Sequence, residues 1–521
     1  MRNKSKGIDI GSCFPIMGIE NGFIVNKAAE VTAAYRVTLP EIFTLQGEEY
    51  ETMHSSWLRA LRVLPEYTVL HKQDWFTRDT YRLSRDRAGD SFLERGSERY
   101  FHERPFLDHN CYLFITKTWK GRDRVNGVGG MLMRGHVLPR ELDAGSMDGF
   151  RESVDQFERI MNDSGLVTLS RLGAGELLGD DRVPGLFERH LSLSQGTARL
   201  PMEDMLFEDG GLRIGDKRVC TYTISGEASL PVEVSTDSVY GPFTTEASEY
   251  NLSFPAQVGI LLPFDHVYNQ YVFIEDSREI LRELESEAGK MHSMSLVSSE
   301  NGRNEEAIQS FLDTAGQHRL LPVRAHVNVM AWSESREEIA GIGNMIGSAM
   351  SAMGCERVRQ DLVNGPVLYW SSIPGNAGDF PREETFLTFA ENALCFFSGE
   401  TNYKDSPSPF GIKMTDRLTG RPVHVDLSET WMERGIIHNR NKFVLGGSGS
   451  GKSFFMNHML RQYYEQGSHV ILVDMGDSYE GLCKLVNART GGSDGLYFTY
   501  TDDNPISFNP FYTDGAPIMV A

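Results

Sequence analysis

The chain has 521 residues, a length that implies several domains and enough residues to bury large cores. Hydrophobic residues make up 40% and charged residues 24%, as in an ordinary soluble globular protein. The formal net charge of −21 at pH 7 excludes a general nucleic-acid coat and a strongly basic membrane-surface protein, although it allows a local basic patch.

The cysteines and the amino terminus indicate the compartment. Six cysteines lie far apart and form no C-x-x-C pair, which predicts buried thiols in a reducing cytoplasm, not disulfides or a zinc site. They are Cys13, Cys111, Cys220, Cys355, Cys395 and Cys483. Residues 1–6 are basic but lack the apolar core of a signal peptide. The apolar run 258–264 is too short to span a bilayer, so we expect a soluble or at most peripheral protein.

The amino-terminal part alternates between strand and helix patterns. Apolar runs predict strands at 22–25, 34–39, 67–71, 112–116 and 167–169. Trp57, Leu61 and Leu64 share one face of a predicted helix that ends at Pro65, and a second amphipathic helix is expected over 150–160. This alternation predicts an α+β region with a mixed sheet.

The middle of the chain continues the pattern. Residues 204–251 are polar and glycine-punctuated, which favours a β-rich insertion. Two charged helices follow, then a strand over 324–332. Ser335 and Glu338 form a capping-box pattern for a helix whose methionines we expect to fill the core. These methionines are Met345, Met350 and Met353.

One cluster of polar residues invites a metal-site interpretation. His102, Glu103, Asp108 and His109 lie close together in the sequence. Their spacing fits no ligand pattern of known metal sites, so we interpret them as solvated loop residues.

Proline-rich breaks at 374–376 and 406–409 bracket the passage to the carboxyl-terminal part, with an apolar stretch at 385–390 between them. Residues 411–427 then predict a hairpin around Thr419-Gly420. His424 and Asp426 in this hairpin resemble catalytic residues, but we interpret them as part of a sheet edge.

The strongest motif follows this hairpin. Residues 446–453 fit the G-x-x-x-x-G-K-[ST] template of a P-loop, or Walker A motif. An apolar run at 442–445 predicts a buried strand before it, and helical spacing from Phe455 to Tyr463 predicts a helix after it, ended by Gly467. The predicted binding residues are Gly446, Gly447, Ser448, Gly449, Ser450, Gly451, Lys452 and Ser453.

The spacing of the motif has a chemical reason. Glycines let successive N–H groups point inward at the positive end of the helix dipole, where they cradle a polyphosphate. Lys452 is placed to reach the β- and γ-phosphates and to neutralise developing charge, which makes it the catalytic candidate. The Ser453 hydroxyl is placed to ligate Mg²⁺, so ATP and Mg²⁺ are the expected cofactors.

Residues 469–474 predict a second buried strand that ends at Asp474. It superficially resembles a Walker B strand, but it follows the first helix directly and Met475 occupies the place of a catalytic glutamate. We therefore expect Asp474 to lie near the nucleotide and to contact the ligands of the magnesium, without being its main ligand. A third strand is expected over 496–501. Ala521 lies 69 residues after Lys452, so we expect a RecA-like core that is truncated before Walker B.

Several stretches together resemble the large cytoplasmic ATPases of type IV secretion and conjugation machines. They are residues 438–446, 374–376, 397–399 and 506–510. Residues 71–76 and 103–107 narrow the resemblance to the TraG conjugation proteins of Bacteroidetes conjugative transposons. The resemblance covers essentially the whole chain.

The resemblance implies a P-loop ATPase peripheral to the inner membrane, hexameric when full length, that energises assembly of the mating channel or DNA transfer. Its partners would be channel subunits, with possible indirect contact to the transferred DNA. Walker B carboxylates and the intersubunit arginine of that family have no counterpart here, so we hold two alternatives open. These are a DNA translocase or helicase-like motor, and a nucleotide-binding assembly module that does not hydrolyse.

The expected fold is α/β and α+β multidomain: mixed amino-terminal domains, then the first half of a RecA-like P-loop NTPase domain. The expected ranges are a strand-rich domain at 1–55, a channel-docking region at 56–400 and a partial NTPase domain at 401–521.

Overall fold

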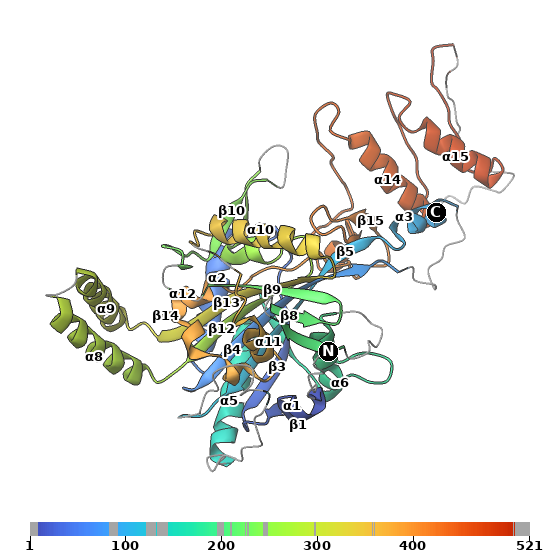
Figure 1. The fold of residues 1–521 in the computed structure, drawn as a ribbon. Coiled ribbons are helices and arrows are strands. Elements are labelled where there is room, and N and C mark those ends of the chain that lie inside the picture. The colour runs from blue at the N-terminus through green and yellow to red at the C-terminus, as the bar shows by residue number, and fades with distance from the viewer. Residues whose placement is uncertain are drawn as a thin grey trace. The chain divides into compact units, whose positions relative to one another are not determined.

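The computed structural model shows two compact units (Figure 1). The first comprises residues 1–81, 105–404 and 416–421, and the second comprises 82–104, 405–415 and 422–521. Residues described by the structure are 9–82, 92–120, 132, 144–194, 203–208, 211–224, 226, 229–242, 248–295, 299–356, 358, 360–503 and 505. The three expected domain ranges stay a prediction. Strands from residues 1–55 and from 56–400 share one sheet of the first unit.

A 12-stranded sheet organises the first unit, in the order β1-β2-β3-β5-β4-β12-β13-β9-β8-β7, with β6 on β3 and β14 on β13. Its strands are β1 (Ile16–Glu20), β2 (Phe23–Asn26), β3 (Val31–Thr38), β4 (Thr68–Thr80), β5 (Pro105–Lys117), β6 (Thr168–Arg171), β7 (Met205–Glu208), β8 (Gly211–Ile214), β9 (Lys217–Ile224), β12 (His266–Ile274), β13 (Pro322–Ser333) and β14 (Phe386–Phe389). Every pairing among these described strands is antiparallel, so the expectation of a mixed sheet is wrong.

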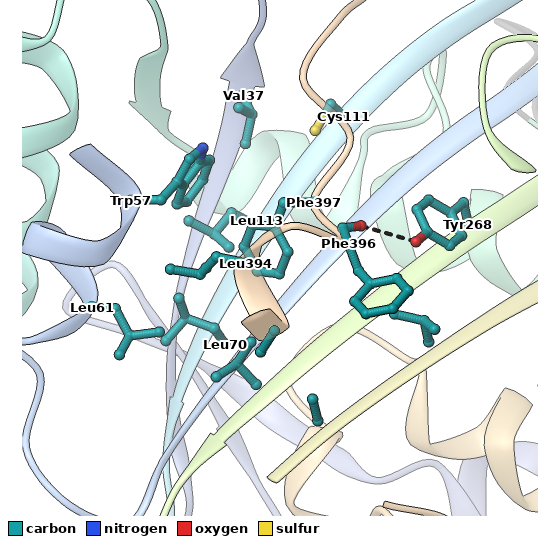
Figure 2. Packing of buried hydrophobic residues seen from close by; sticks show 14 of the residues in the cluster. Val37, Trp57, Leu61, Leu70, Cys111, Leu113, Tyr268, Leu394, Phe396 and Phe397 are labelled. Carbon is teal, nitrogen blue, oxygen red and sulfur yellow. Dashed lines mark hydrogen bonds between the residues drawn. The ribbon is translucent and has the colours of Figure 1, made fainter. Parts of the chain in front are cut away.

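Helices cover both faces of this sheet. One face packs on α2 (Gly47–Leu61), α5 (Ala144–Asp163), α10 (Arg336–Ala352) and α12 (Ala390–Leu394). In Figure 2, Trp57 of α2 lies near Leu394 and Phe397 in this core, and Phe396 lies next to Tyr268 of β12. The other face packs on α1 (Ile10–Cys13), α6 (Ala174–Leu178), α7 (Leu186–Ser192) and α11 (Gly365–Ser371). Apolar helix faces predicted from periodicity are therefore the ones buried against the sheet.

Other elements of the first unit complete it. The helices α8 (Ser277–Ser295) and α9 (Ser299–His318) form the two expected charged helices and pack on each other. The expected insertion is β-rich: β7, β8 and β9 join the large sheet, while β10 (Asp237–Tyr240) pairs with β11 (Tyr250–Ser253). Short 3₁₀ turns span Phe254–Val258, Ala377–Asp379 and Arg382–Glu384.

Local signals at α10 and at the cysteines are confirmed in the described residues, except at Met345 and Cys483. The Ser335 side chain accepts a hydrogen bond from Glu338 N and so caps α10. Met350 and Met353 lie in the core, whereas Met345 is exposed. All six cysteines are free thiols, and only Cys483 is not buried.

The sheet interior also holds ionisable residues that the sequence did not lead us to expect. Lys72 and Asp74 are fully buried and form an ion pair of 2.5 Å. His109 Nε2 lies 3.0 Å from Asp74 Oδ1, and His109 Nδ1 lies 2.7 Å from Thr401 Oγ1. Burial opposes ionisation of Asp74, but Lys72 and His109 outweigh it and hold the pKa of Asp74 below its usual value. The interpretation of His109 as a solvated loop residue is therefore wrong, because β5 buries it.

The remaining residues of the metal-site cluster are dispersed. Asp108 lies in β5, where its carboxylate accepts from Arg421 at 2.7 Å. His102 and Glu103 are exposed or nearly so, and no group of three or more potential metal-ligating side chains occurs in the described parts of the chain. No described helix is both long and apolar enough to cross a bilayer.

The second unit contains α3 (Phe92–Phe101), β15 (Ile412–Thr415), β16 (Pro422–Val425), α13 (Glu429–Glu433), α14 (Lys452–Glu465) and α15 (Glu480–Thr490). The expected hairpin is confirmed, since β15 and β16 pair antiparallel. Asp426 does not extend this edge: it accepts hydrogen bonds from Ser428 N (2.9 Å) and Glu429 N (2.8 Å), at the start of α13.

Three strands expected in the second unit are not formed. Residues 442–445 and 469–474 have no strand assignment, and within 496–501 only Thr501 forms an isolated bridge. The apolar side chains of the three segments are largely exposed. Phe443, for example, is 88% exposed and Val473 98%. A strand needs a hydrogen-bonded neighbouring strand, and these segments have none among the described residues.

Candidate nucleotide-binding site

Two glycines decide how the loop turns into α14. Gly451, the N-cap of α14, has a φ of 90°, and Gly449 has a φ of 78°. A side chain at such angles would be strained, whereas glycine adopts them readily. The loop at 446–451 therefore enters the helix at Lys452, as the motif predicts.

The loop also folds tightly against itself. A β-carbon added at Gly446 would lie 2.5 Å from Ser450 Oγ, whereas at Gly447 nothing lies within 4 Å. The Lys452 ammonium donates hydrogen bonds to the carbonyl oxygens of Gly446 and Gly447, each at 2.7 Å. Lys452 is thus folded back over the loop, with its charge satisfied by two backbone dipoles.

This arrangement fits a polyphosphate. Helix α14 leaves its first N–H groups without intrahelical acceptors, and its first-turn hydrogen bond runs from Phe455 N to Gly451 O at 2.9 Å. These N–H groups lie at the positive end of the helix dipole, which favours an anion. Phosphate oxygens could replace the two carbonyl oxygens as acceptors for Lys452, and the exposed Ser453 hydroxyl remains accessible to a divalent cation.

Helix α14 is held in place by β15. Met459 and Leu460 pack with the fully buried Ile412. The Gln462 side chain accepts from Lys413 N at 2.6 Å, and the Gln466 side chain accepts from Gly411 N at 2.9 Å. This apolar face with two side-chain-to-strand bonds fixes the helix on the hairpin that precedes it in sequence.

Asp474 lies in an exposed segment close to α14. Its Oδ2 accepts from Ser478 N at 3.2 Å. Asn457 of α14 donates from its side-chain nitrogen to Ser478 O at 3.0 Å and to Ser453 O at 2.9 Å. The structure therefore joins the segment after Asp474 to the first turn of the helix through Asn457, which the sequence reasoning missed. An asparagine one helical turn after the motif serine is the signal that could have pointed to it.

The segment that leads to the loop is tied down as well. Arg440 donates two hydrogen bonds to the Glu429 carboxylate, at 2.5 and 2.7 Å. The Lys442 ammonium donates to Ser428 Oγ at 3.3 Å. Residues 506–510, which contributed to the expected resemblance, lie outside the described residues.

Two family models match parts of this chain. Residues 411–519 match the family model described as the TraG P-loop domain. Residues 3–55 match a domain of unknown function, DUF3875. Protein TraC of Escherichia coli (strain K12) is 34% identical over 73 residues, which cover 14% of this chain and 7% of TraC. The matched stretch is thus only a small part of the length of TraC.

The loop geometry and the sequence matches concern the same part of the chain. The matched range 411–519 includes the β15–β16 hairpin, the loop at 446–451 and helix α14. The expected resemblance to TraG-like conjugation proteins is confirmed, since residues 411–519 match the TraG P-loop domain and a shorter stretch is similar to the conjugation protein TraC.

Proposed function

We propose that the protein is the ATP-binding motor subunit of a conjugation or type IV secretion system and energises channel assembly or DNA transfer by ATP hydrolysis. The observation that carries the proposal is the loop at 446–453, in which glycine geometry, the helix amino terminus and Lys452 converge. A RecA-like fold of the NTPase domain belongs to this proposal.

Each residue of the loop has a role in this proposal. Backbone N–H groups from Gly447 to Ser453 bind the phosphate oxygens of ATP. Lys452 leaves its two carbonyl acceptors, contacts the β- and γ-phosphates and neutralises charge that develops during transfer. The Ser453 hydroxyl binds Mg²⁺, which supplies further charge neutralisation when it is bound.

The setting of the motor is also part of the proposal. We infer a protein that is peripheral to the inner membrane and forms a homo-hexamer, with conjugation channel subunits as partners and indirect contact with the transferred DNA. An origin in a conjugative transposon is the narrower form of this proposal.

A binding measurement tests the site. Lys452→Ala should weaken ATP binding about 10- to 100-fold, because charge-assisted hydrogen bonds to phosphate contribute roughly 1.5–3 kcal/mol. Lys484→Ala is the matched control, since Lys484 forms an i,i+4 ion pair with Glu480 on α15. Calorimetric titration with ATP compares the affinities of both variants with that of the wild type. Equal affinities of the wild type and Lys452→Ala would refute the assignment of the site.

Turnover assays separate this function from its alternatives. ATP binding with no hydrolysis, together with co-purification of channel subunits, would favour the assembly module. Hydrolysis that rises on addition of DNA would favour the translocase.

A further inference from the structure

Asn457 bridges two parts of the candidate site. It lies one helical turn after Ser453, and its side-chain nitrogen donates to Ser453 O at 2.9 Å and to Ser478 O at 3.0 Å. Both acceptors are carbonyl oxygens, so the two protons of the Asn457 amide are both used. The residue therefore links the first turn of α14 to the segment 474–478.

The linked segment carries a carboxylate. Ser478, whose carbonyl Asn457 binds, donates its own N–H to Asp474 Oδ2 at 3.2 Å. The connection thus runs from Ser453 through Asn457 and Ser478 to Asp474, within one continuous set of hydrogen bonds. Asp474 is exposed, and its segment has no strand partner among the described residues. Few other interactions therefore fix this carboxylate.

We infer that Asn457 is a positioning residue that holds Asp474 beside the divalent cation bound at Ser453. This inference rests on the proposed function, because it assumes a nucleotide–metal complex in the loop. A hard cation such as Mg²⁺ keeps several water ligands, and a nearby carboxylate accepts hydrogen bonds from them. Asn457 acts through Asp474 and touches neither nucleotide nor metal.

A purely structural role for Asn457 predicts a different result. An asparagine that only braces a helix would affect stability and leave the cation dependence of binding unchanged. Asn487 offers the matched control: it lies on α15, is similarly half-buried, and its side-chain nitrogen donates to Asp494 O at 3.0 Å. It braces a helix against a loop in the same unit, and none of its hydrogen bonds leads to Asp474.

The experiment measures ATP affinity in excess Mg²⁺ and in excess chelator, for the wild type, Asn457→Leu and Asn487→Leu. The dissociation constant in chelator divided by the dissociation constant in Mg²⁺ measures how much the cation strengthens ATP binding. We expect Asn457→Leu to reduce this ratio about tenfold, as loss of an outer-shell partner does at metal sites. Asn487→Leu should keep the wild-type ratio. Affinity in chelator should be similar in all three proteins.

Asp474→Asn keeps the test independent of the folding of Asn457→Leu, since Asp474 is on the surface. It should reduce the ratio about as much, and the double variant should reduce it no further. An unchanged ratio in Asn457→Leu or Asp474→Asn, or a wild type without any Mg²⁺ dependence, overturns the inference. If ATP binding instead survives Lys452→Ala, the proposed function fails first, so the two failures are distinguishable.

Discussion

Acid should unfold the first unit at an unusually mild pH, because four histidines are buried in or against its sheet. His71, His190, His266 and His326 are at most 2% exposed. Burial lowers the pKa of His71 and His190 to about 3, and that of His266 and His326 to about 4. In the unfolded chain each would have a pKa of about 6.5.

The sign follows from proton binding. Below about pH 6.5 the unfolded chain binds a proton at each histidine, whereas the folded chain keeps all four neutral until about pH 4. The stability is therefore complete above pH 6.5 and is lost as the pH falls toward the lowered pKa values. Each proton bound only by the unfolded chain lowers the free energy of unfolding by about 1.4 kcal/mol per pH unit. Four such protons therefore give a slope of about 5 kcal/mol per pH unit near pH 5.

The predicted loss is large compared with ordinary stabilities. Between pH 6.5 and 4.5 it sums to about 10 kcal/mol, and whole domains are stable by about 5–15 kcal/mol. Burial also raises the pKa values of Glu400 and Asp265, and each of these carboxyls offsets at most one of the four protons. Asp74, with its lowered pKa, acts in the same direction as the histidines but only below about pH 4.

Urea unfolding of the full chain, followed by tryptophan fluorescence at pH 7.5, 6.5, 5.5 and 5.0, measures this slope. His71→Phe should reduce the slope by about one proton, whatever its effect at neutral pH. Met330→Leu, a change at another buried residue of the same sheet, should alter stability equally at every pH. The reasoning would be refuted if the free energy of unfolding changed between pH 6.5 and 5 by less than the uptake of one proton predicts. It would also be refuted if His71→Phe had the same pH dependence of stability as the wild type.

Two further predictions concern single atoms. Tyr271 is buried and its hydroxyl has no hydrogen-bond partner in the described residues, so Tyr271→Phe should leave stability unchanged or raise it by up to about 1 kcal/mol. The hydroxyl of Tyr268, on the opposite face of β12, donates a hydrogen bond to a backbone carbonyl at 2.9 Å, so Tyr268→Phe should lower the free energy of unfolding by about 1 kcal/mol. Urea unfolding midpoints of both variants at pH 7.5 test this pair of predictions. A Tyr271→Phe variant that is less stable than Tyr268→Phe would contradict them. Gly446→Ala should weaken ATP binding more than Gly447→Ala, because only the first added methyl meets Ser450 Oγ, and calorimetry giving equal affinities would contradict the loop geometry.

Local chemistry determined the elements that the sequence predicted well. The glycines of the P-loop and the lysine after them specify a turn and a helix start that need no distant partner, and α14 begins at Lys452 as expected. The Ser335 cap of α10 and the hairpin around Gly420 are also local signals. Each rests on backbone angles or on hydrogen bonds between residues near in sequence.

The tertiary structure decided what depends on partners distant in sequence. Lys72 and Asp74 are charges inside a sheet, and their burial is stable only because His109 and Gln270 come from other strands. The strand expected at 442–445 failed for the converse reason: an apolar run forms a strand only when a neighbour accepts its hydrogen bonds. The link from Asn457 to the segment after Asp474 likewise requires the chain to return to α14. Sequence thus determines local conformation, and pairing decides burial, because the cost of burying a polar group depends on which group meets it.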